Sequence, residues 1–171
     1  MTISIRDTRQ ARSDRGWIES VYRDYLNDLA PLGTGVFPAL TEFGHREPDQ
    51  LASWFADSSA HLLTILKDDS PVGFAMVRTG IMPAGREHFD FSMAEFFIAR
   101  DWRRRGVGKE AVRLICDRFA GRWHIMEYLR NVPAVAFWRR VVSAYTRGDY
   151  RERGGAGEVH QYFDSSVRRV R

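Results

Sequence analysis

The residues with the clearest chemistry form a short basic segment, Arg103-Arg104-Arg105-Gly106-Val107-Gly108. It lies between an apolar stretch typical of a strand and a pattern typical of a helix. The first amides of a helix have no intrahelical partners and sit at the positive end of the helix dipole. Spaced glycines allow the backbone to wrap closely around an anion, and arginine forks match phosphate oxygens. The segment therefore predicts a phosphate-binding turn.

Two other phosphate motifs overlap this turn. Gly108-Lys109 resembles the end of a P-loop, but Glu110 stands where Ser or Thr is required. Residues 106–111 match the dinucleotide pattern G-x-G-x-x-A, and Glu127 lies at a distance that suits a ribose. That fold needs its first glycine directly after a buried strand near the start of the domain, whereas charged residues 101–105 come first here. We therefore disfavour a nicotinamide or flavin protein, and we interpret Glu127 as a solvated strand residue.

Glu95 is a carboxylate within an otherwise apolar strand pattern. Burial disfavours the charged form of a carboxyl group and raises its pKa toward neutrality, where the group can accept a proton. An acid at this position suits general-base catalysis or the binding of a cationic group. The alternative is that Glu95 points to water on the other face of the strand.

The other reactive side chains indicate no second site. Cys116 is the only cysteine, and it falls in a helical pattern where a core position is expected. The histidines are scattered and lack a metal-ligand spacing such as H-E-x-x-H, so we predict no metal. They are His45, His61, His88, His124 and His160.

A sheet and several helices must position these residues. Periodicity and turn residues predict about seven strands and about four helices in the order β-α-α-β-β-β-α-β-α-β-β. Hairpin strands come first and alternate with helices only later, which favours a mixed, mainly antiparallel α+β sheet over a doubly wound one. The predicted strands are residues 2–6, 61–66, 72–77, 88–98, 122–129, 145–150 and 159–163. The first predicted helix follows a cap at Ser13 and Asp14, and the second starts near Pro48. The other two span residues 107–120 and 133–142. Breaks are expected at residues 31–38 and 82–85.

Composition limits the class of protein. The chain has 171 residues with 44% hydrophobic and 28% charged residues, which is typical of one globular domain over residues 1–171. The net charge of +4 is modest, and Arg103 to Arg105 form too short a cluster to follow a nucleic acid, so we expect no nucleic-acid partner. No apolar run is long enough for a membrane span or a secretion signal, which predicts a cytoplasmic protein without a membrane partner. Edge strands after Tyr145 offer unpaired backbone groups that can pair between subunits, so the sequence is compatible with a homodimer.

Two motifs carry a resemblance to a known family. Residues 103–108 fit the pattern Q/R-x-x-G-x-G/A, with Ile98 five residues before the arginine, and residues 131–138 fit N-x-x-A/S-x-x-F-Y/W. In these features the chain resembles the GNAT superfamily of N-acetyltransferases. The resemblance is strong over residues 91–142. The segment Glu95-Phe96-Phe97-Ile98 is similar to the branch that acetylates polyamines and other small amines. Residues 1–60, which shape the acceptor site in this family, show no recognisable motif.

The resemblance implies a fold and a coenzyme site. It implies a GNAT-like sheet in which two parallel central strands splay apart, and acetyl-CoA as co-substrate without a metal. The pantetheine arm would hydrogen-bond to backbone at Phe96, Phe97 and Ile98, in the manner of an added strand. The remaining coenzyme contacts that it implies are Arg103, Arg104, Arg105, Gly106, Val107, Gly108 and Lys109 around the pyrophosphate, and Asn131, Ala134, Phe137 and Trp138 on the far side.

The resemblance also implies roles in catalysis. Glu95 would be the base, and a backbone amide near Ile98 would stabilise the oxyanion. The family often uses a tyrosine acid where this chain has Trp138, whose N–H has no useful acidity. The leaving thiolate would then receive its proton from Tyr145, from Tyr128 or from water.

The resemblance implies acetyl transfer from acetyl-CoA to a primary amine of a small molecule by direct attack in a ternary complex. Two alternatives stay open. Asp90 and Glu95 would also attract the N-terminus or a lysine of a protein. Trp138 at the usual tyrosine position also suits a non-catalytic acyl-CoA-binding module.

Overall fold

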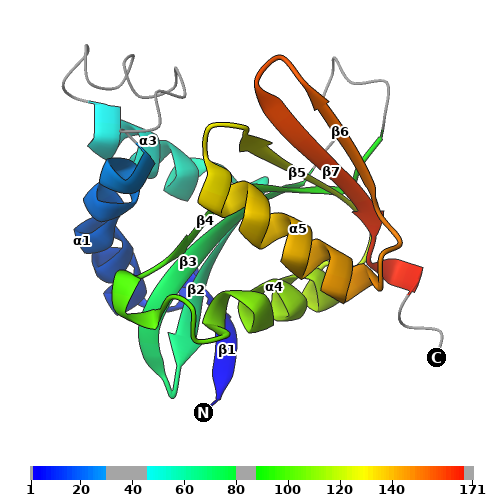
Figure 1. Cartoon of the computed structure of the whole chain (residues 1–171). Coiled ribbons are helices and arrows are strands. Elements are labelled where there is room, and N and C mark those ends of the chain that lie inside the picture. Colours follow the sequence, from blue (N-terminus) through cyan, green and yellow to red (C-terminus); the bar gives the residue numbers. More distant parts are fainter. Residues whose placement is uncertain (1, 30–45, 80–87, 168–171) are drawn as a thin grey trace.

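The computed structural model describes residues 2–29, 46–79, 88–167 of the chain (Figure 1). Its strands form one sheet in the order β1-β2-β3-β4-β5-β7-β6, in which β4 and β5 are parallel and all other neighbours are antiparallel. The predicted mixed, mainly antiparallel α+β fold is therefore confirmed. The strands are β1 Ile3–Asp7, β2 Ala60–Lys67, β3 Ser70–Thr79, β4 Phe91–Ile98, β5 Arg122–Tyr128, β6 Arg151–Gly155 and β7 Glu158–Asp164.

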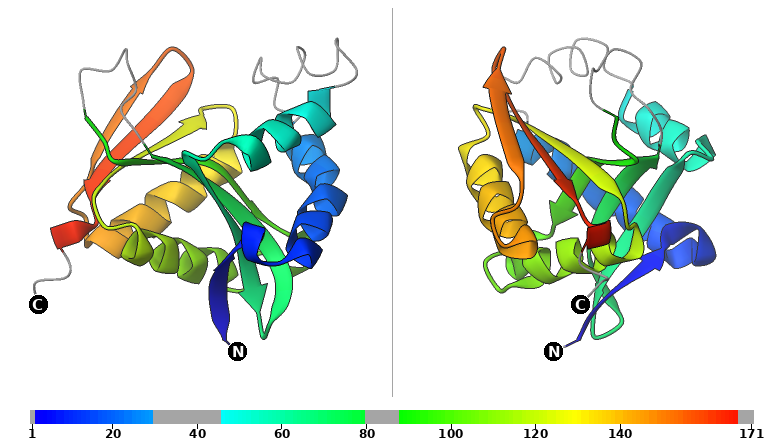
Figure 2. Two further views of the ribbon diagram at one scale, coloured as in Figure 1. Left: turned by 180° about the vertical axis from the view of Figure 1, so that it is seen from behind. Right: turned by 90° about the vertical axis from the view of Figure 1, so that its right-hand side faces the viewer.

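Helices cover both faces of this sheet. Within the described ranges the α-helices are α1 Arg12–Leu29, α3 Arg46–Ala56, α4 Val107–Arg118 and α5 Val132–Thr146. Helices α1 and α3 pack on one face, and α4 and α5 pack on the other (Figure 2). None of the helices described is long and apolar enough to cross a membrane. The predicted breaks at residues 31–38 and 82–85 lie outside the described residues.

Helix α1 shows how the sequence pattern selects the buried face. Its buried apolar residues, Ile18, Tyr22 and Leu26, recur every four positions and face β3 and β4. The helix begins at Arg12, ahead of the predicted cap at Ser13 and Asp14. Asp14 is instead buried, and its two carboxylate oxygens accept hydrogen bonds from Arg6 of β1 at 2.8 and 2.7 Å. Arg6 and Asp14 thus tie the start of α1 to the sheet.

Strand β4 contains an extra residue that decides where its side chains point. Val77 of β3 pairs with Met93, but the next residue, Met76, pairs with Glu95, so Ala94 has no opposite partner. Such a β-bulge shifts the alternation of side chains by one position. Met93 accordingly packs with α4 and α5, whereas Glu95 faces α1 and α3.

The two parallel strands pair only at one end. The pairing of β4 with β5 runs from Phe91 with Trp123 to Met93 with Ile125. Beyond that point the strands separate, and Figure 1 shows β4 and β5 diverging on either side of α5. The splayed pair implied by the family resemblance is therefore present.

Helix α5 is longer than predicted, and this corrects two expectations. It continues to Thr146, so residues 145–150 do not form a strand and Tyr145 lies on the helix. The buried residues Trp138, Val141, Val142 and Tyr145 keep the helical spacing that sustains it. Strand β6 begins only at Arg151 and includes Gly154 and Gly155, and Ala156 and Gly157 form the turn to β7.

Gly73 is a position where the fold allows no side chain. A Cβ atom there would overlap the backbone oxygen of Phe97 and come within 2.8 Å of Ile98 Cδ1. We expect Gly73→Ala to lower the free energy of unfolding by about 1–3 kcal/mol, because β3 and β4 must move apart. Urea unfolding measures this change.

Gly16 provides the matched control for this substitution. It lies within α1, and a Cβ atom added to it would meet nothing within 4 Å in the described parts of the chain. Gly16→Ala should therefore stabilise the protein by up to about 1 kcal/mol through helix propensity. A stabilising effect of both substitutions would contradict the close approach at Gly73.

Candidate active site

The glycine-arginine turn lies at the start of α4, as the sequence predicts. Gly106 caps the helix with a φ of 82°, in the left-handed region that glycine adopts without strain. The first helical hydrogen bond is donated by Glu110 N to Gly106 O at 3.1 Å. The amides of residues 107–109 therefore precede it, and they provide donors at the positive end of the helix.

A cavity of about 710 Å³ opens onto this turn. Most of the coenzyme residues expected from the sequence line it, together with residues of α1 and α5. The predicted ones are Phe96, Phe97, Ile98, Arg103, Arg104, Gly106, Gly108, Lys109, Asn131, Ala134, Phe137 and Trp138. The sequence reasoning did not assign Tyr25, Asp28, Leu29, Pro133 or Arg140 to this cavity.

Two predicted residues of the turn lie elsewhere. The side chain of Val107 is fully buried in a cluster beneath the turn, with Ile65 and Ala111. The guanidinium of Arg105 lies over the ring of Trp102 at 5.6 Å, and Arg105 does not line the cavity. The positive charge facing the cavity therefore comes from Arg103, Arg104, Lys109 and Arg140.

Arg103 is held in place by the protein itself. Its Nε donates to the carbonyl oxygen of Ile98 at 2.7 Å, and its Nη2 donates to Asp28 of α1. Arg100 also donates to Asp28, at 2.6 Å. Burial of Asp28 opposes ionisation, but the hydrogen bonds from Arg103 and Arg100 outweigh it and lower the pKa of this carboxyl. Arg103 thus links the end of β4 to α1 at the edge of the cavity.

A second cavity, of about 350 Å³, adjoins the first and contains Glu95. Six residues line both cavities, so the two spaces share a wall. These are Tyr25, Leu29, Phe96, Asn131, Ala134 and Trp138. Phe96 is part of this wall, and its ring centroid lies 5.7 Å from that of Phe137 and 5.3 Å from that of Trp138.

Glu95 is only 9% exposed and points toward α1 and α3. Its Oε1 accepts hydrogen bonds from Tyr22 Oη and Trp54 Nε1, both at 3.1 Å, and its Oε2 has no partner in the described parts of the chain. Burial raises the pKa of Glu95 to about 7, although Tyr22, Trp54 and the charge of Arg78 counteract the rise. The alternative in which Glu95 points to water is wrong. A carboxyl group with this pKa can accept a proton near neutral pH.

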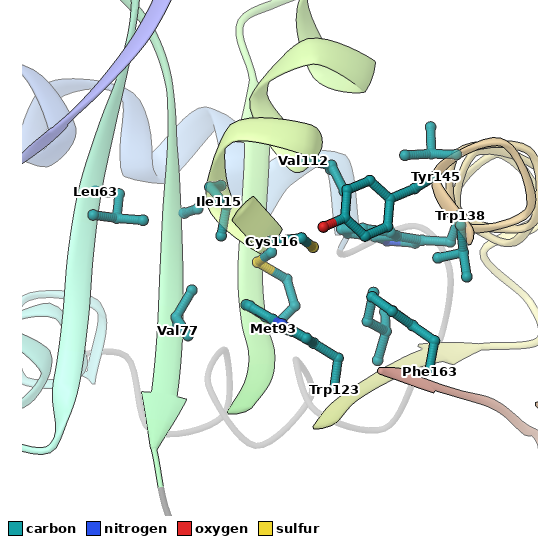
Figure 3. Packing of buried hydrophobic residues seen from close by; sticks show 14 residues of the cluster. Leu63, Val77, Met93, Val112, Ile115, Cys116, Trp123, Trp138, Tyr145 and Phe163 are labelled. Atoms are coloured by element: carbon teal, nitrogen blue, oxygen red, sulfur yellow. The ribbon is translucent and has the colours of Figure 1, made fainter. Parts of the chain in front are cut away.

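Tyr145 does not reach either cavity. It projects from α5 toward α4 within the hydrophobic cluster of that face, as Figure 3 shows, and its hydroxyl donates to Asp117 Oδ1 at 2.9 Å. Tyr128, the other tyrosine considered, does line the cavity of Glu95. Burial, followed by the charge of Glu158, raises the pKa of Tyr128.

Asp90 does not contribute to the cavity of Glu95. Its carboxylate binds Arg122 through both oxygens, at 3.1 and 3.3 Å from the guanidinium. The hydrogen bonds from Arg122 lower the pKa of Asp90. The acidic pair considered for a peptide amine is therefore not assembled at this site.

Glu127 is the main site residue that the sequence reasoning missed. It is 5% exposed and lines the same cavity as Glu95, so its interpretation as a solvated strand residue is wrong. The alternation of β5 carried a signal, because Trp123, Ile125 and Glu127 share one face of the strand. No grouping of His, Cys, Asp and Glu suited to a metal occurs in the described ranges.

The family model described as Acetyltransferase (GNAT) family matches residues 18–142. A search of curated proteins finds no match. Several solved structures share the fold over nearly the whole chain. A GNAT-family acetyltransferase from Streptococcus agalactiae has 14% identity and a TM-score of 0.69, covering 94% of this chain and 93% of that one.

Two further structures carry more specific names. The PaiA N-acetyltransferase from Thermoplasma acidophilum, in complex with coenzyme A, has 12% identity and a TM-score of 0.59, covering 96% of this chain and 99% of that one. A chimera of the spermidine N-acetyltransferase SpeG from Vibrio cholerae has 14% identity and a TM-score of 0.61, covering 100% of both chains. At these identities the likeness shows the fold alone.

Proposed function

Since the chain belongs to the GNAT acetyltransferase family, we propose that it transfers the acetyl group of acetyl-CoA to a primary amine of a small molecule. Residues 1–171 would act as one acyltransferase domain. The observation that carries the proposal is the pair of adjoining cavities. One has the cationic turn and the start of α4, which suit a pyrophosphate, and the other has Glu95, which suits an amine.

The separation of β4 from β5 supports a position for the thioester at the wall that the two cavities share. Beyond Met93 the backbone of β4 that faces β5 is not paired with that strand. Its amide and carbonyl groups near Phe96 and Phe97 are therefore open to an extended pantetheine arm, which would bind as an added strand does. This arrangement would carry the acyl group to the wall shared by the two cavities.

The proposed reaction is a direct attack in a ternary complex. Glu95 takes a proton from the ammonium group of the acceptor, and the neutral amine attacks the thioester carbonyl. A backbone amide near Ile98 stabilises the oxyanion that forms. The C–S bond then breaks and the thiolate of coenzyme A leaves, while the nitrogen gives its second proton to water and the amide product forms. Because Tyr145 lies away from the cavities, we assign protonation of the thiolate to water or to Tyr128.

Calorimetry with acetyl-CoA, with NADH and ATP as controls, tests the donor. Micromolar binding of acetyl-CoA without binding of the controls is expected, followed by thiol release on addition of a panel of amines. Binding of NADH in place of acetyl-CoA would contradict the proposal. Binding without thiol release for any amine, peptide amines included, would indicate a non-catalytic binding module.

Two cations of the larger cavity should contribute to coenzyme affinity. Arg104→Ala combined with Lys109→Ala is expected to weaken acetyl-CoA binding about tenfold or more, because charge-assisted contacts to phosphate are lost. The dissociation constant is measured by calorimetry. Arg113→Ala is the control, because Arg113 lies on the same helix but pairs with Glu110 and Asp117. Equal weakening in both proteins would show an effect of net charge, not of contacts at the turn.

A further inference from the structure

Glu127 of β5 is a buried carboxyl group that the proposed reaction does not use. Neither of its oxygens has a hydrogen-bond partner in the part of the chain that the structure describes. Gln161, fully buried on the neighbouring strand β7, likewise has an unpartnered Oε1 there. Its Nε2 donates to Glu152 Oε2 at 3.1 Å. Acceptor atoms thus outnumber donors on this part of the sheet, although buried polar groups are normally paired.

The nearby cation does not satisfy Glu127. Arg139 of α5 directs its guanidinium to Glu152, with contacts of 3.0 Å from Nε to both oxygens and 2.6 Å from Nη2. Burial and the negative charge of Glu152 raise the pKa of Glu127 to about 8, against the opposing effect of Arg139. The other residues on this face of β5, Trp123 and Ile125, are apolar core residues. An apolar side chain would therefore suit the fold better at position 127, which points to a role in binding.

The splay places Glu127 across the opening from Glu95. Each lies two residues beyond the last paired residues, Met93 and Ile125. The bulge at Ala94 turns Glu95 toward α1 and α3, whereas Glu127 keeps the orientation of Ile125 toward α5. Both carboxyl groups line the same cavity of about 350 Å³. A ligand that enters between the strands therefore meets one acid on each side of the sheet.

We infer that the acceptor is a diamine, an inference that rests on the proposed function. Its reacting nitrogen lies at Glu95, and its second, protonated nitrogen is bound by Glu127. A short alkyl chain between the nitrogens suits the apolar residues that line the same cavity, among them Met93, Ile125 and Trp138. The ammonium group supplies donors to the unpartnered oxygens of Glu127. It also compensates the cost of a buried negative charge, which an uncharged ligand cannot do.

Binding of a diamine should release protons from the two carboxyl groups. At pH 7 the raised pKa values of Glu95 and Glu127 keep a substantial share of both groups protonated. A bound dication favours their ionised forms and so expels protons into the buffer. The charged groups that act on Glu127 are Glu152 and Arg139, and the groups that act on Glu95 are Tyr22, Trp54 and Arg78. Deletion of the Glu127 carboxyl group should therefore reduce this proton release.

The test compares an amine with its diamine. We expect kcat/KM of the unaltered protein for 1,4-diaminobutane to exceed that for butylamine by about tenfold or more, the factor expected for a charge-assisted hydrogen bond. In Glu127→Gln this ratio should fall toward one. Glu158→Gln is the control, because Glu158 lies on β7, contacts His160 at 3.0 Å and does not line the cavity. Its ratio should match that of the unaltered protein.

Calorimetry supplies a readout independent of turnover. The diamine is titrated into the protein saturated with coenzyme A, in two buffers of different ionisation enthalpy at pH 7. Proton release is expected for the unaltered protein and should be smaller for Glu127→Gln. Thermal unfolding of the variant checks that this isosteric change leaves the protein folded.

The outcomes separate the inference from the proposed function. Equal kcat/KM for the amine and the diamine in the unaltered protein would overturn the inference and leave acetylation of amines intact. An unchanged ratio and unchanged proton release in folded Glu127→Gln would likewise overturn it. Failure of acetyl-CoA to bind would instead remove the proposed function.

Discussion

Glu95→Gln is expected to lower kcat about a hundredfold or more, while the dissociation constant for acetyl-CoA stays unchanged. The amide cannot accept the proton of the acceptor ammonium, and general-base catalysis contributes about 10²–10⁴-fold. The fold should persist, because the amide can still accept hydrogen bonds from Tyr22 and Trp54 through its oxygen. Thiol release under saturating substrates measures kcat, and calorimetry measures coenzyme binding. Full activity of the variant would remove Glu95 from the proton transfer.

The pH dependence of the unaltered protein follows from the same group. Glu95 acts when it is ionised, so kcat/KM should rise as pH increases through about 7, the raised pKa of this carboxyl. Tyr22→Phe removes a hydrogen bond that stabilises the ionised form, so it should move the midpoint of this rise to higher pH. A midpoint that is the same in both proteins would argue that another group controls the profile.

Trp123→Ala is expected to lower the free energy of unfolding by about 3–5 kcal/mol, the range for removal of a large aromatic side chain from a core. Trp123 is fully buried in the hydrophobic cluster between the sheet, α4 and α5 (Figure 3). Its ring centroid lies 5.4 Å from that of Phe91 and 6.3 Å from that of Phe163. Its Nε1 donates to Phe119 O at 2.9 Å, so the substitution also leaves a carbonyl oxygen without this donor. Chemical denaturation measures the change.

The effect should extend to the site because Trp123 forms the first pair of β4 with β5, opposite Phe91. Coenzyme affinity is therefore expected to fall in the folded variant. Val132→Ala is the control: Val132 is 67% exposed, so its truncation should change the free energy of unfolding by less than about 0.5 kcal/mol. A loss as small in Trp123→Ala would show that this end of the strand pair does not depend on the indole ring.

The parts of the site that could be predicted from the sequence have local causes. The turn at residues 103–108 is encoded by its own glycines and arginines, and α4 follows it with the expected apolar spacing. The hairpin of β2 and β3 is likewise marked by two apolar runs and a turn between them, at Asp68 and Asp69. In each case the residues that form the feature are neighbours in the chain.

The parts that could not be predicted depend on distant residues. The bulge at Ala94 exists only relative to β3, because the count of residues on one strand reveals nothing without its partner. The burial of Glu127 depends on helix α5 and on β7, which cover it from later in the chain. The local composition around Tyr145 favours a strand, whereas the apolar face of α5 extends the helix through it. Packing overrides local preference at these positions.

The bulge at Ala94 lets β4 hold one extra residue while its pairing with β3 continues on both sides. Side chains on a strand alternate, so the layer that each one enters is set by whether the number of residues before it is odd or even. Loss of Ala94 alone would leave Met93 opposite Val77 and Glu95 opposite Met76, so it would remove the bulge without changing the layer that either side chain enters. An insertion or deletion between Glu95 and Ile98, by contrast, would exchange the layers of the residues beyond it unless a second bulge absorbed the change, whereas point substitutions along the strand keep every side chain in its layer.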